Sequence, residues 1–182
     1  MSQHNQLIRV RAPEYWVGTS AKMHAALRYV SKTSDFDYLV RTNSSTYLDI
    51  AGMMAFLEAA PRSRYYAGSR NGEARHARGT CIILSRDIVD RMSEDHTWRY
   101  DWVDDRAMGA SALKLGVEAE LYEQVFVTSE DAIPQALADK NRSFIFRLKT
   151  RGDRRSDIRI MKALHDALTR RAACGDQESA ET

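Results

Sequence analysis

The sequence has little of what several large protein classes require. Charged residues interrupt every hydrophobic stretch, so no segment offers the roughly 20 consecutive apolar residues of a membrane-spanning helix. Glycine and proline number only 9 and 3, which argues against a fibrous or disordered chain. At 182 residues, 43% of them hydrophobic, the chain is long enough to bury a core. We expect one globular domain without a membrane span.

Neither sign of charge predominates, and cysteine is scarce. The 27 basic and 25 acidic residues leave a net charge of +2, so the composition gives no general reason to expect a nucleic acid as partner. Cys81 and Cys174 stand far apart and match neither a metal-ligand spacing nor a disulfide framework, which indicates a reducing compartment. The first residues lack the charged start and apolar run of a signal peptide, and we therefore expect a cytoplasmic protein.

Hydrophobic periodicity predicts strands that alternate with helices. Such alternation is typical of an α/β fold, here a single domain over residues 1–174 with a mainly parallel central sheet flanked by helices. A disordered polar tail is expected at residues 175–182. The predicted strands cover residues 7–10, 37–42, 64–67, 80–84 and 143–148, and the predicted helices cover about 19–30, 48–59, 86–92, 104–115 and 157–171.

Two segments without hydrophobic periodicity are expected to be loops. Asn43–Thr46 is polar and follows a predicted strand, and its Ser or Thr could cap the next helix. Gly68–Gly79 is rich in glycine and arginine, which predicts a mobile loop. His76 in that loop could reach a phosphate or a metal, and a solvated histidine is the simpler interpretation. Elsewhere, Ser85 is a predicted helix cap, and Gly116 is a suitable residue to follow the end of the 104–115 helix.

Four segments in order resemble the fringe and galactosyltransferase-type glycosyltransferases. They are Tyr15–Met23, Phe36–Ser45, Gly79–Asp87 and Val103–Gly109, and the resemblance covers roughly Glu14–Val117. In those enzymes a helix precedes a strand that ends in an Asp-x-Asp loop, and a strand with Leu-Ser-Arg precedes an acid pair followed by glycine. The resemblance implies a GT-A-like fold and transfer of a sugar from a nucleotide-sugar, most simply a UDP-sugar, to a hydroxyl acceptor such as a glycan.

The acid pair Asp104-Asp105 carries the catalytic prediction. In an inverting transfer, a carboxylate must take the proton of the attacking hydroxyl, and the resemblance assigns that role to Asp105. Asp104 would orient the base, bind acceptor hydroxyls or exchange roles with it. Taken without the other segments, the pair is explained as helix N-terminal acids that the helix dipole stabilises. Trp98 and Trp102, just ahead of the pair, could stack on an acceptor sugar or pack a helix onto the sheet.

The expected donor loop departs from the family pattern. Asn43-Ser-Ser45 stands where Asp-x-Asp is expected, so Mn²⁺ or Mg²⁺, which the resemblance implies, would find only neutral oxygens of Asn43 and Ser45. Donor contacts are predicted from these two residues and from arginines that would supply positive charge in place of a metal. The arginines are Arg41, Arg78 and Arg147.

The chain is also short ahead of the first matching segment. Only residues 1–13 precede it, whereas the resembled enzymes begin with a strand-helix-strand unit that holds the nucleotide. The chain would then be a fragment, or a reduced domain that binds its donor differently or not at all. One alternative is therefore a truncated or degenerate relative that binds a glycan or a partner without turnover. Another is a nucleic-acid-associated protein that uses the arginines of residues 151–155 and 170–171.

Overall fold

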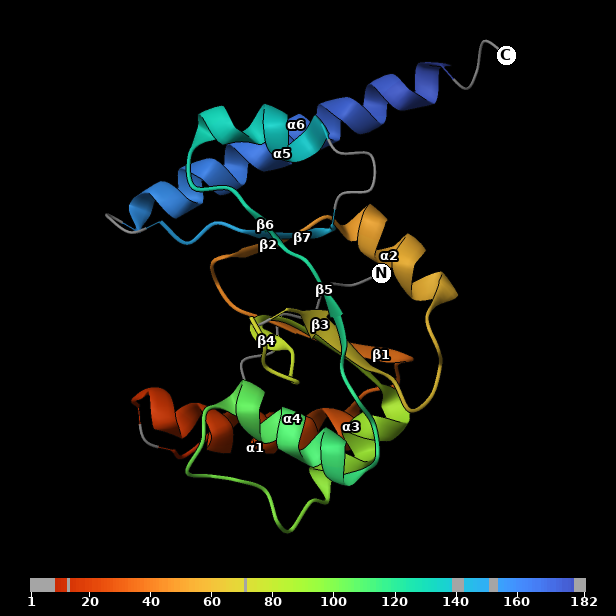
Figure 1. The fold of residues 1–182 in the computed structure, drawn as a ribbon, viewed down its shortest axis with the longest axis vertical. Helices are drawn as coiled ribbons and strands as arrows, with labels where there is room; N and C mark the ends of the chain where they lie inside the picture. The colour runs from red at the N-terminus through yellow and green to blue at the C-terminus, as the bar shows by residue number, and fades with distance from the viewer. Residues whose placement is uncertain (1–8, 13, 71, 139–142, 151–153, 179–182) are drawn as a thin grey trace. The chain divides into compact units, whose positions relative to one another are not determined.

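The protein has an α/β fold, and its described residues form two compact units. The computed structural model describes residues 9–12, 14–70, 72–138, 143–150 and 154–178. Unit 1 consists of Met1–Arg41 with Pro61–Leu121, and unit 2 consists of Thr42–Ala60 with Tyr122–Thr182. Helices and strands alternate through both (Figure 1). That a single domain spans residues 1–174 stays a prediction.

Unit 1 is a four-stranded sheet with helices on one face. The strands lie in the order β1-β4-β3-β5, and β3 pairs with β4 antiparallel with an irregularity after Gly68. Figure 1 shows α1, α3 and α4 together on one face of this sheet. The strands are β1 (Tyr38–Thr42), β3 (Tyr66–Ser69), β4 (Arg78–Ser85) and β5 (Glu120–Tyr122); the helices are a short 3-10 turn (Trp16–Gly18), α1 (Thr19–Thr33), α3 (Arg86–Ser93) and α4 (Asp104–Lys114).

The core of unit 1 forms around β4. The apolar run Cys81–Leu84 is fully buried, as expected of a central strand. Ile88 and Met92, one turn apart on α3, pack in the same cluster as Met108 of α4. Burial raises the pKa of the Cys81 thiol to about 12, so this cysteine is an unreactive core residue.

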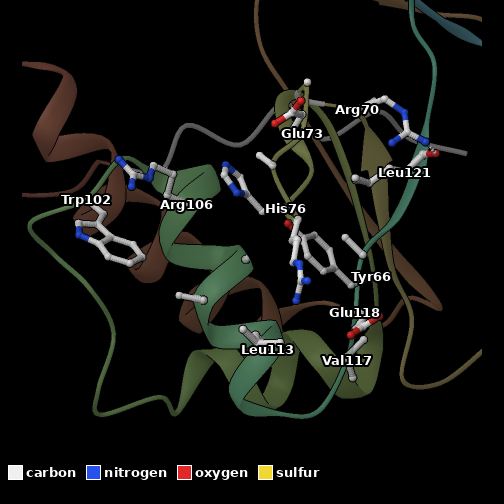
Figure 2. Close-up of a pocket in the computed structure, with 16 residues that line it drawn as sticks. Tyr66, Arg70, Glu73, His76, Trp102, Arg106, Leu113, Val117, Glu118 and Leu121 are labelled. Carbon is white, nitrogen blue, oxygen red and sulfur yellow. Dashed lines mark hydrogen bonds between the residues drawn. The ribbon is translucent and has the colours of Figure 1, made fainter.

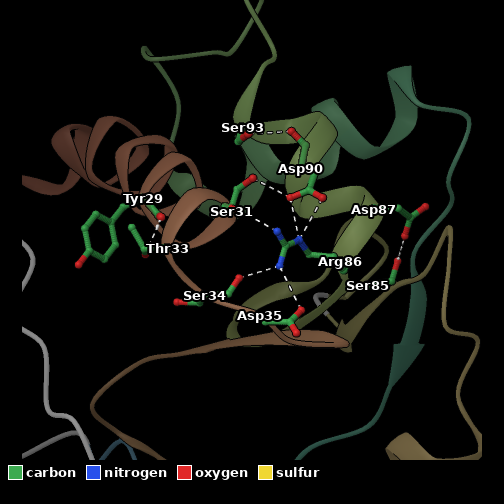
Figure 3. A network of polar contacts seen from close by, with 10 residues as sticks. All are labelled: Tyr29, Ser31, Thr33, Ser34, Asp35, Ser85, Arg86, Asp87, Asp90 and Ser93. Atoms are coloured by element: carbon green, nitrogen blue, oxygen red, sulfur yellow. Dashed lines mark hydrogen bonds and ion pairs between the residues drawn. The ribbon is translucent and has the colours of Figure 1, made fainter.

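The Leu-Ser-Arg-Asp segment fastens α3 to α1 (Figure 3). Arg86 Nε donates to both carboxylate oxygens of Asp90 at 2.9 and 3.0 Å, and its Nη atoms donate to the backbone oxygens of Ser31 and Ser34 at 2.8 and 2.7 Å. Ser85 Oγ donates to Asp87 Oδ1 at 2.6 Å. Because one guanidinium serves the ends of two helices, the arginine and serine of this motif have a structural role in the fold.

The described residues of unit 2 combine a three-stranded mixed sheet with three α-helices and a 3-10 turn. The strand order is β2-β7-β6, with β2 antiparallel and β6 parallel to β7. Phe146 of β7 packs with Leu164 of α6 and Leu137 of α5 in the core of this unit. The strands are β2 (Thr46–Leu48), β6 (Val125–Phe126) and β7 (Ile145–Arg147); the helices are α2 (Ile50–Ala59), a 3-10 turn (Glu130–Ala132), α5 (Ile133–Ala138) and α6 (Arg155–Glu178).

Most predicted helices and strands are confirmed, and the mainly parallel sheet is not. The two antiparallel pairs, β3-β4 and β2-β7, make the sheets mixed. The predicted loop-and-cap at 43–46 needs a correction, because Thr46 already belongs to β2 and the cap of α2 is Asp49, whose side chain accepts from the Gly52 N–H. Gly116 follows α4 with φ +69°, a conformation that glycine adopts without strain, as predicted.

Some boundaries lie elsewhere than the pattern indicates. Gly68 and Ser69 belong to β3, and Arg78 and Gly79 belong to β4, so the loop between them is shorter than predicted. Helix α6 continues past residue 171 to Glu178, and residues 179–182 lie outside the described residues. The predicted strand at 7–10 lies partly outside them, and residues 9–10 are not in a strand. None of the described helices has the length and apolar character needed to cross a membrane.

Candidate functional site

Three segments far apart in the sequence meet at the acid pair in unit 1. The guanidinium of Arg41, at the end of β1, forms an ion pair with Asp104 Oδ2 and donates to the backbone oxygen of Gly79. The backbone N–H of Gly79, in β4, donates to Asp105 Oδ2 at 3.0 Å. The end of β1, the start of β4 and the start of α4 therefore form one polar cluster. This cluster unites parts of three of the four segments that suggested a glycosyltransferase.

The two acids of the pair have different environments. Asp104 is buried and its charge is balanced by Arg41. Asp105 is half-buried, and its Oδ1 accepts from the Arg106 backbone N–H at 2.8 Å. Backbone donors hold the Asp105 carboxylate in a fixed orientation while each oxygen keeps a lone pair for a further proton donor. Of the two, Asp105 is the carboxylate that an incoming hydroxyl could use.

A cavity of about 650 Å³ lies beside the same helix, within the size range of ligand sites (Figure 2). Arg106, Gly109, Ala110 and Leu113 form one face of α4, and they line one wall. The opposite side comes from β3, from the loop that follows it and from the segment leading into β5. The remaining lining residues are Tyr66, Arg70, Gly72, Glu73, Ala74, Arg75, His76, Trp102, Val117, Glu118, Ala119 and Leu121.

Tyr66 connects the cavity to the acid pair. Its ring is buried, its hydroxyl accepts the Ala77 backbone N–H at 2.9 Å, and it lines the cavity. Burial raises the pKa of Tyr66, and the nearby negative charge of Asp105 raises it further. The Asp105 carboxylate thus acts electrostatically on a group in the cavity wall, although Asp105 itself is not a lining residue.

Gly109 lets the loop after β3 approach α4. A Cβ at Gly109 would lie 2.3 Å from the Cβ of His76 and 3.5 Å from the Tyr66 hydroxyl oxygen. No larger residue fits without moving this loop. The histidine that the sequence suggested as solvated is therefore a half-buried part of the cavity wall.

The two tryptophans proposed for the acceptor differ in location. Trp102 lines the cavity and is half-buried, with the guanidinium carbons of Arg99 and Arg106 at 4.2 and 5.1 Å from its ring. Trp98 is only 4% exposed; its Nε1 donates to Ser20 Oγ at 2.9 Å and its ring stacks on His24 at 4.7 Å. The acceptor role predicted for Trp98 is therefore corrected: it is a core residue that holds α1.

The predicted donor residues of the Asn43-Ser45 loop lie in unit 2, where they bind arginines. Asn43 Oδ1 accepts from the Ser45 backbone N–H at 3.2 Å, from Thr46 Oγ1 at 2.9 Å and from Arg147 Nη1. Ser45 is buried and its hydroxyl accepts from Arg154 Nη2. Arg154 also pairs with Asp157 at 2.6 Å. Two guanidinium groups therefore adjoin the loop.

This arrangement disfavours a cation at the loop. The side-chain oxygens of Asn43 and Ser45 both face arginine, and a divalent ion there would meet like charges instead of carboxylates. Throughout the part of the chain that the structure describes, no three His, Cys, Asp or Glu side chains are placed to hold a metal ion. Arg41 binds Asp104 and Gly79 instead of standing free for a donor, and Arg78 is exposed on β4.

No protein-family model matches the chain, and no curated protein matches it. The resemblance to glycosyltransferases therefore stays a prediction, as does the cytoplasmic location.

Several site residues were not predicted from the sequence. Arg154 lies 109 positions from Ser45, and nothing local in either segment signals their contact. Tyr66 was predicted only as a strand residue, and Arg106 was not singled out. The glycine that follows the acid pair was a usable signal, because a residue without a side chain on α4 lets another segment approach the helix closely.

Proposed function

We propose that the protein is a glycosyltransferase that moves a sugar from a nucleotide-sugar to a hydroxyl acceptor with inversion. Asp105 is the general base in this proposal. The observation that carries it is the convergence of Arg41, Gly79 and the acid pair, three of the family-like segments, beside a cavity of ligand size. Helix α4 joins the two features, because Asp105 is followed by Arg106, which lines the cavity.

The chemistry needs one fixed carboxylate. The acceptor oxygen attacks the anomeric carbon, its proton passes to Asp105, and the bond from that carbon to the diphosphate breaks with its electron pair on the diphosphate. Asp105 suits the role because backbone N–H groups orient it. Asp104 serves as a positioning residue, since its ion pair with Arg41 fixes the first turn of α4.

The departing diphosphate requires positive charge. We assign this to Arg78, which is exposed on β4 of unit 1, next to Gly79, whose backbone N–H binds Asp105. Arginine binds phosphate oxygens in a bidentate manner and needs no metal to do so. The proposal is thus a metal-independent transferase with a UDP-sugar as the simplest donor.

Calorimetry with UDP-sugars, with manganese and with chelator, tests donor binding. A hydrolysis and transfer assay then compares the native chain with Asp105→Asn, for which we expect a loss of turnover of at least about a hundredfold, the usual range for removing a general base. The matched control is Asp101→Asn, a nearby exposed acid paired with Arg99. Absence of nucleotide-sugar binding at millimolar concentration would falsify the proposed glycosyltransferase activity. Unchanged turnover in Asp105→Asn would remove only the assigned base.

A second candidate function is a glycan-binding module without turnover. The observation that favours it is the engagement of Asn43 and Ser45 by arginines, which leaves the loop without the metal ligands of the resembled enzymes. In that case the cavity would bind saccharide while nucleotide-sugars would not bind. The same calorimetry separates the two functions.

A further inference from the structure

The charges of the cavity beside α4 are unevenly distributed along it. Arg106 is in the first turn of the helix and Leu113 in the last, about 10 Å apart at 1.5 Å per residue. Trp102 precedes the helix, and Glu118 follows its end. Figure 2 accordingly shows Trp102, Arg106 and His76 toward one end of the cavity, and Arg70, Glu118 and Leu121 toward the other. We call these the tryptophan end and the leucine end.

The tryptophan end holds a cation that is not neutralised. Within the described residues, Arg106 forms no ion pair and its guanidinium contacts the Trp102 ring. Arg75 also lines the cavity and has no ion pair with a described residue. Both arginines are exposed, so their guanidinium groups can reach a ligand in the cavity. An unpaired guanidinium beside an aromatic ring is suited to a carboxylate carried by a ring that can pack against that aromatic side chain.

The cavity also has the mixed lining that saccharides need. Leu113, Val117 and Leu121 give an apolar wall for the C–H face of a sugar. The Glu118 carboxylate can accept a hydrogen bond from a sugar hydroxyl. Trp102, half-buried and with Arg99 and Arg106 over its ring, adds an aromatic side chain to the lining. A simple inorganic anion would use only the arginines and leave this wall unfilled.

We propose that this cavity binds an acidic saccharide, a hexuronic acid unit, with its carboxylate at Arg106. The inference rests on the proposed function, because it identifies the acceptor of that transferase as an acidic glycan. The Asp105 carboxylate, one residue before the lining residue Arg106, would then receive the proton of a hydroxyl on the bound unit.

The test compares three probes on the full chain by calorimetry or ligand-observed NMR. They are a methyl hexuronide, the methyl hexoside that differs from it only in lacking the carboxylate, and inorganic phosphate. We expect the hexuronide to bind at least about tenfold more tightly than the hexoside, the size of one charge-assisted hydrogen bond. Arg106→Gln should remove this difference, and Arg91→Gln, an exposed arginine of α3 outside the cavity, should leave it unchanged.

The remaining outcomes overturn the inference. Equal binding of hexuronide and hexoside removes the role of the arginines, and phosphate that competes equally with hexuronide reveals a bare anion site. Hexuronide binding that survives both Arg106→Gln and Trp102→Leu lies elsewhere on the molecule. Binding of none of the probes also contradicts it.

Failure of this inference can be told apart from failure of the proposed function. UDP-sugar binding is measured on the same protein without saccharide. A chain that binds the nucleotide-sugar and not the hexuronide remains a transferase with a different acceptor. If the chain binds the hexuronide and not the nucleotide-sugar, the acidic-saccharide site is supported and the transferase activity is contradicted.

Discussion

Arg41 and Asp104 form an ion pair across 63 positions of sequence, with side chains only 19% and 10% exposed. Removing one partner of such a pair leaves the other charge unpaired at a site that water barely reaches. The folded state is strongly destabilised as a result. We predict that Arg41→Met lowers the free energy of unfolding by about 3 kcal/mol. Urea denaturation monitored by circular dichroism gives the value.

The matched control for this prediction is Arg62→Met. It breaks the Arg62–Asp37 pair, whose side chains are 61% and 68% exposed. Water solvates the remaining carboxylate there, so the expected loss is below about 1 kcal/mol. Equal losses in the two variants would show that burial of the Arg41–Asp104 pair has no energetic consequence.

His24 should make the protein less stable in mild acid. Burial lowers the pKa of His24, so below its ordinary value of about 6.5 the unfolded chain binds a proton more readily than the folded one. Stability is therefore highest above pH 6.5 and falls as the pH drops below it. The urea midpoint should decrease between pH 7.5 and pH 5.5, and His24→Gln should flatten this decrease. His96→Gln, at an exposed position, serves as the comparison; an equal flattening there would contradict the assignment.

Asp95 should stabilise the protein in its ionised form. Burial alone would raise the pKa of Asp95, but hydrogen bonds from Thr97 and Ser111 and the charge of Lys114 hold it down at about 2. Since its ordinary value is 3.8, the contribution is present above pH 3.8 and is lost as the pH falls toward 2. With a side chain 13% exposed, Asp95→Asn should cost about 2 kcal/mol at pH 7.

The measurement for Asp95 is the unfolding free energy as a function of pH. The native chain and Asp95→Asn should converge near pH 2. Glu94→Gln changes an exposed neighbouring acid and should leave the free energy at pH 7 nearly unchanged. A difference between Asp95→Asn and native that is constant over pH would point to lost packing instead of lost charge.

Gly109→Ala should destabilise the protein although alanine favours helices. The gain in helix propensity is about 1 kcal/mol, but the new Cβ would lie 2.3 Å from the Cβ of His76. We expect a net loss of about 1 to 3 kcal/mol, the usual cost of overpacking, and a weaker saccharide ligand because the cavity wall shifts. Thermal unfolding and the calorimetry described above measure both effects.

A second substitution tests the cause of that loss. His76→Ala keeps the Cβ that collides and should not rescue Gly109→Ala. His76→Gly removes it and should restore part of the stability. Rescue by both variants, or by neither, would show that the close approach of the loop to α4 is not the source of the effect.

Locally encoded elements were predictable, and long-range ones were not. The apolar run of β4 and the spacing along α1 and α3 are properties of one segment, so periodicity identifies them. Strand β2 has three residues and exists because Thr46–Leu48 pairs with Ile145–Arg147 at the other end of the chain. Read alone, Thr46 therefore looks like the end of a polar loop and Leu48 like the start of the next helix, whose cap is in fact Asp49.

The candidate site likewise has features that the sequence predicts and features that it does not. That an acid pair begins a helix can be read from Asp104-Asp105 and Gly116, and α4 begins at Asp104. Which acid pairs with Arg41 and which accepts the Gly79 N–H depends on the order of β1 and β4 in the sheet, which no local pattern records. For the same reason Trp98 and Trp102, four positions apart, looked equivalent, whereas Trp98 is buried and Trp102 only half-buried.

The pairing of β2 with β7 has a consequence for synthesis on the ribosome. The chain leaves unit 2 at Ala60 and returns to it at Tyr122, so the partner of Tyr47 is made about one hundred residues later. All of unit 1 is translated before Phe146 is synthesised. Until then, the backbone groups of Thr46–Leu48 have no strand partner in β7. A stalled or truncated product ending near residue 130 would expose that edge permanently, and we expect such products to aggregate or to be retained by chaperones.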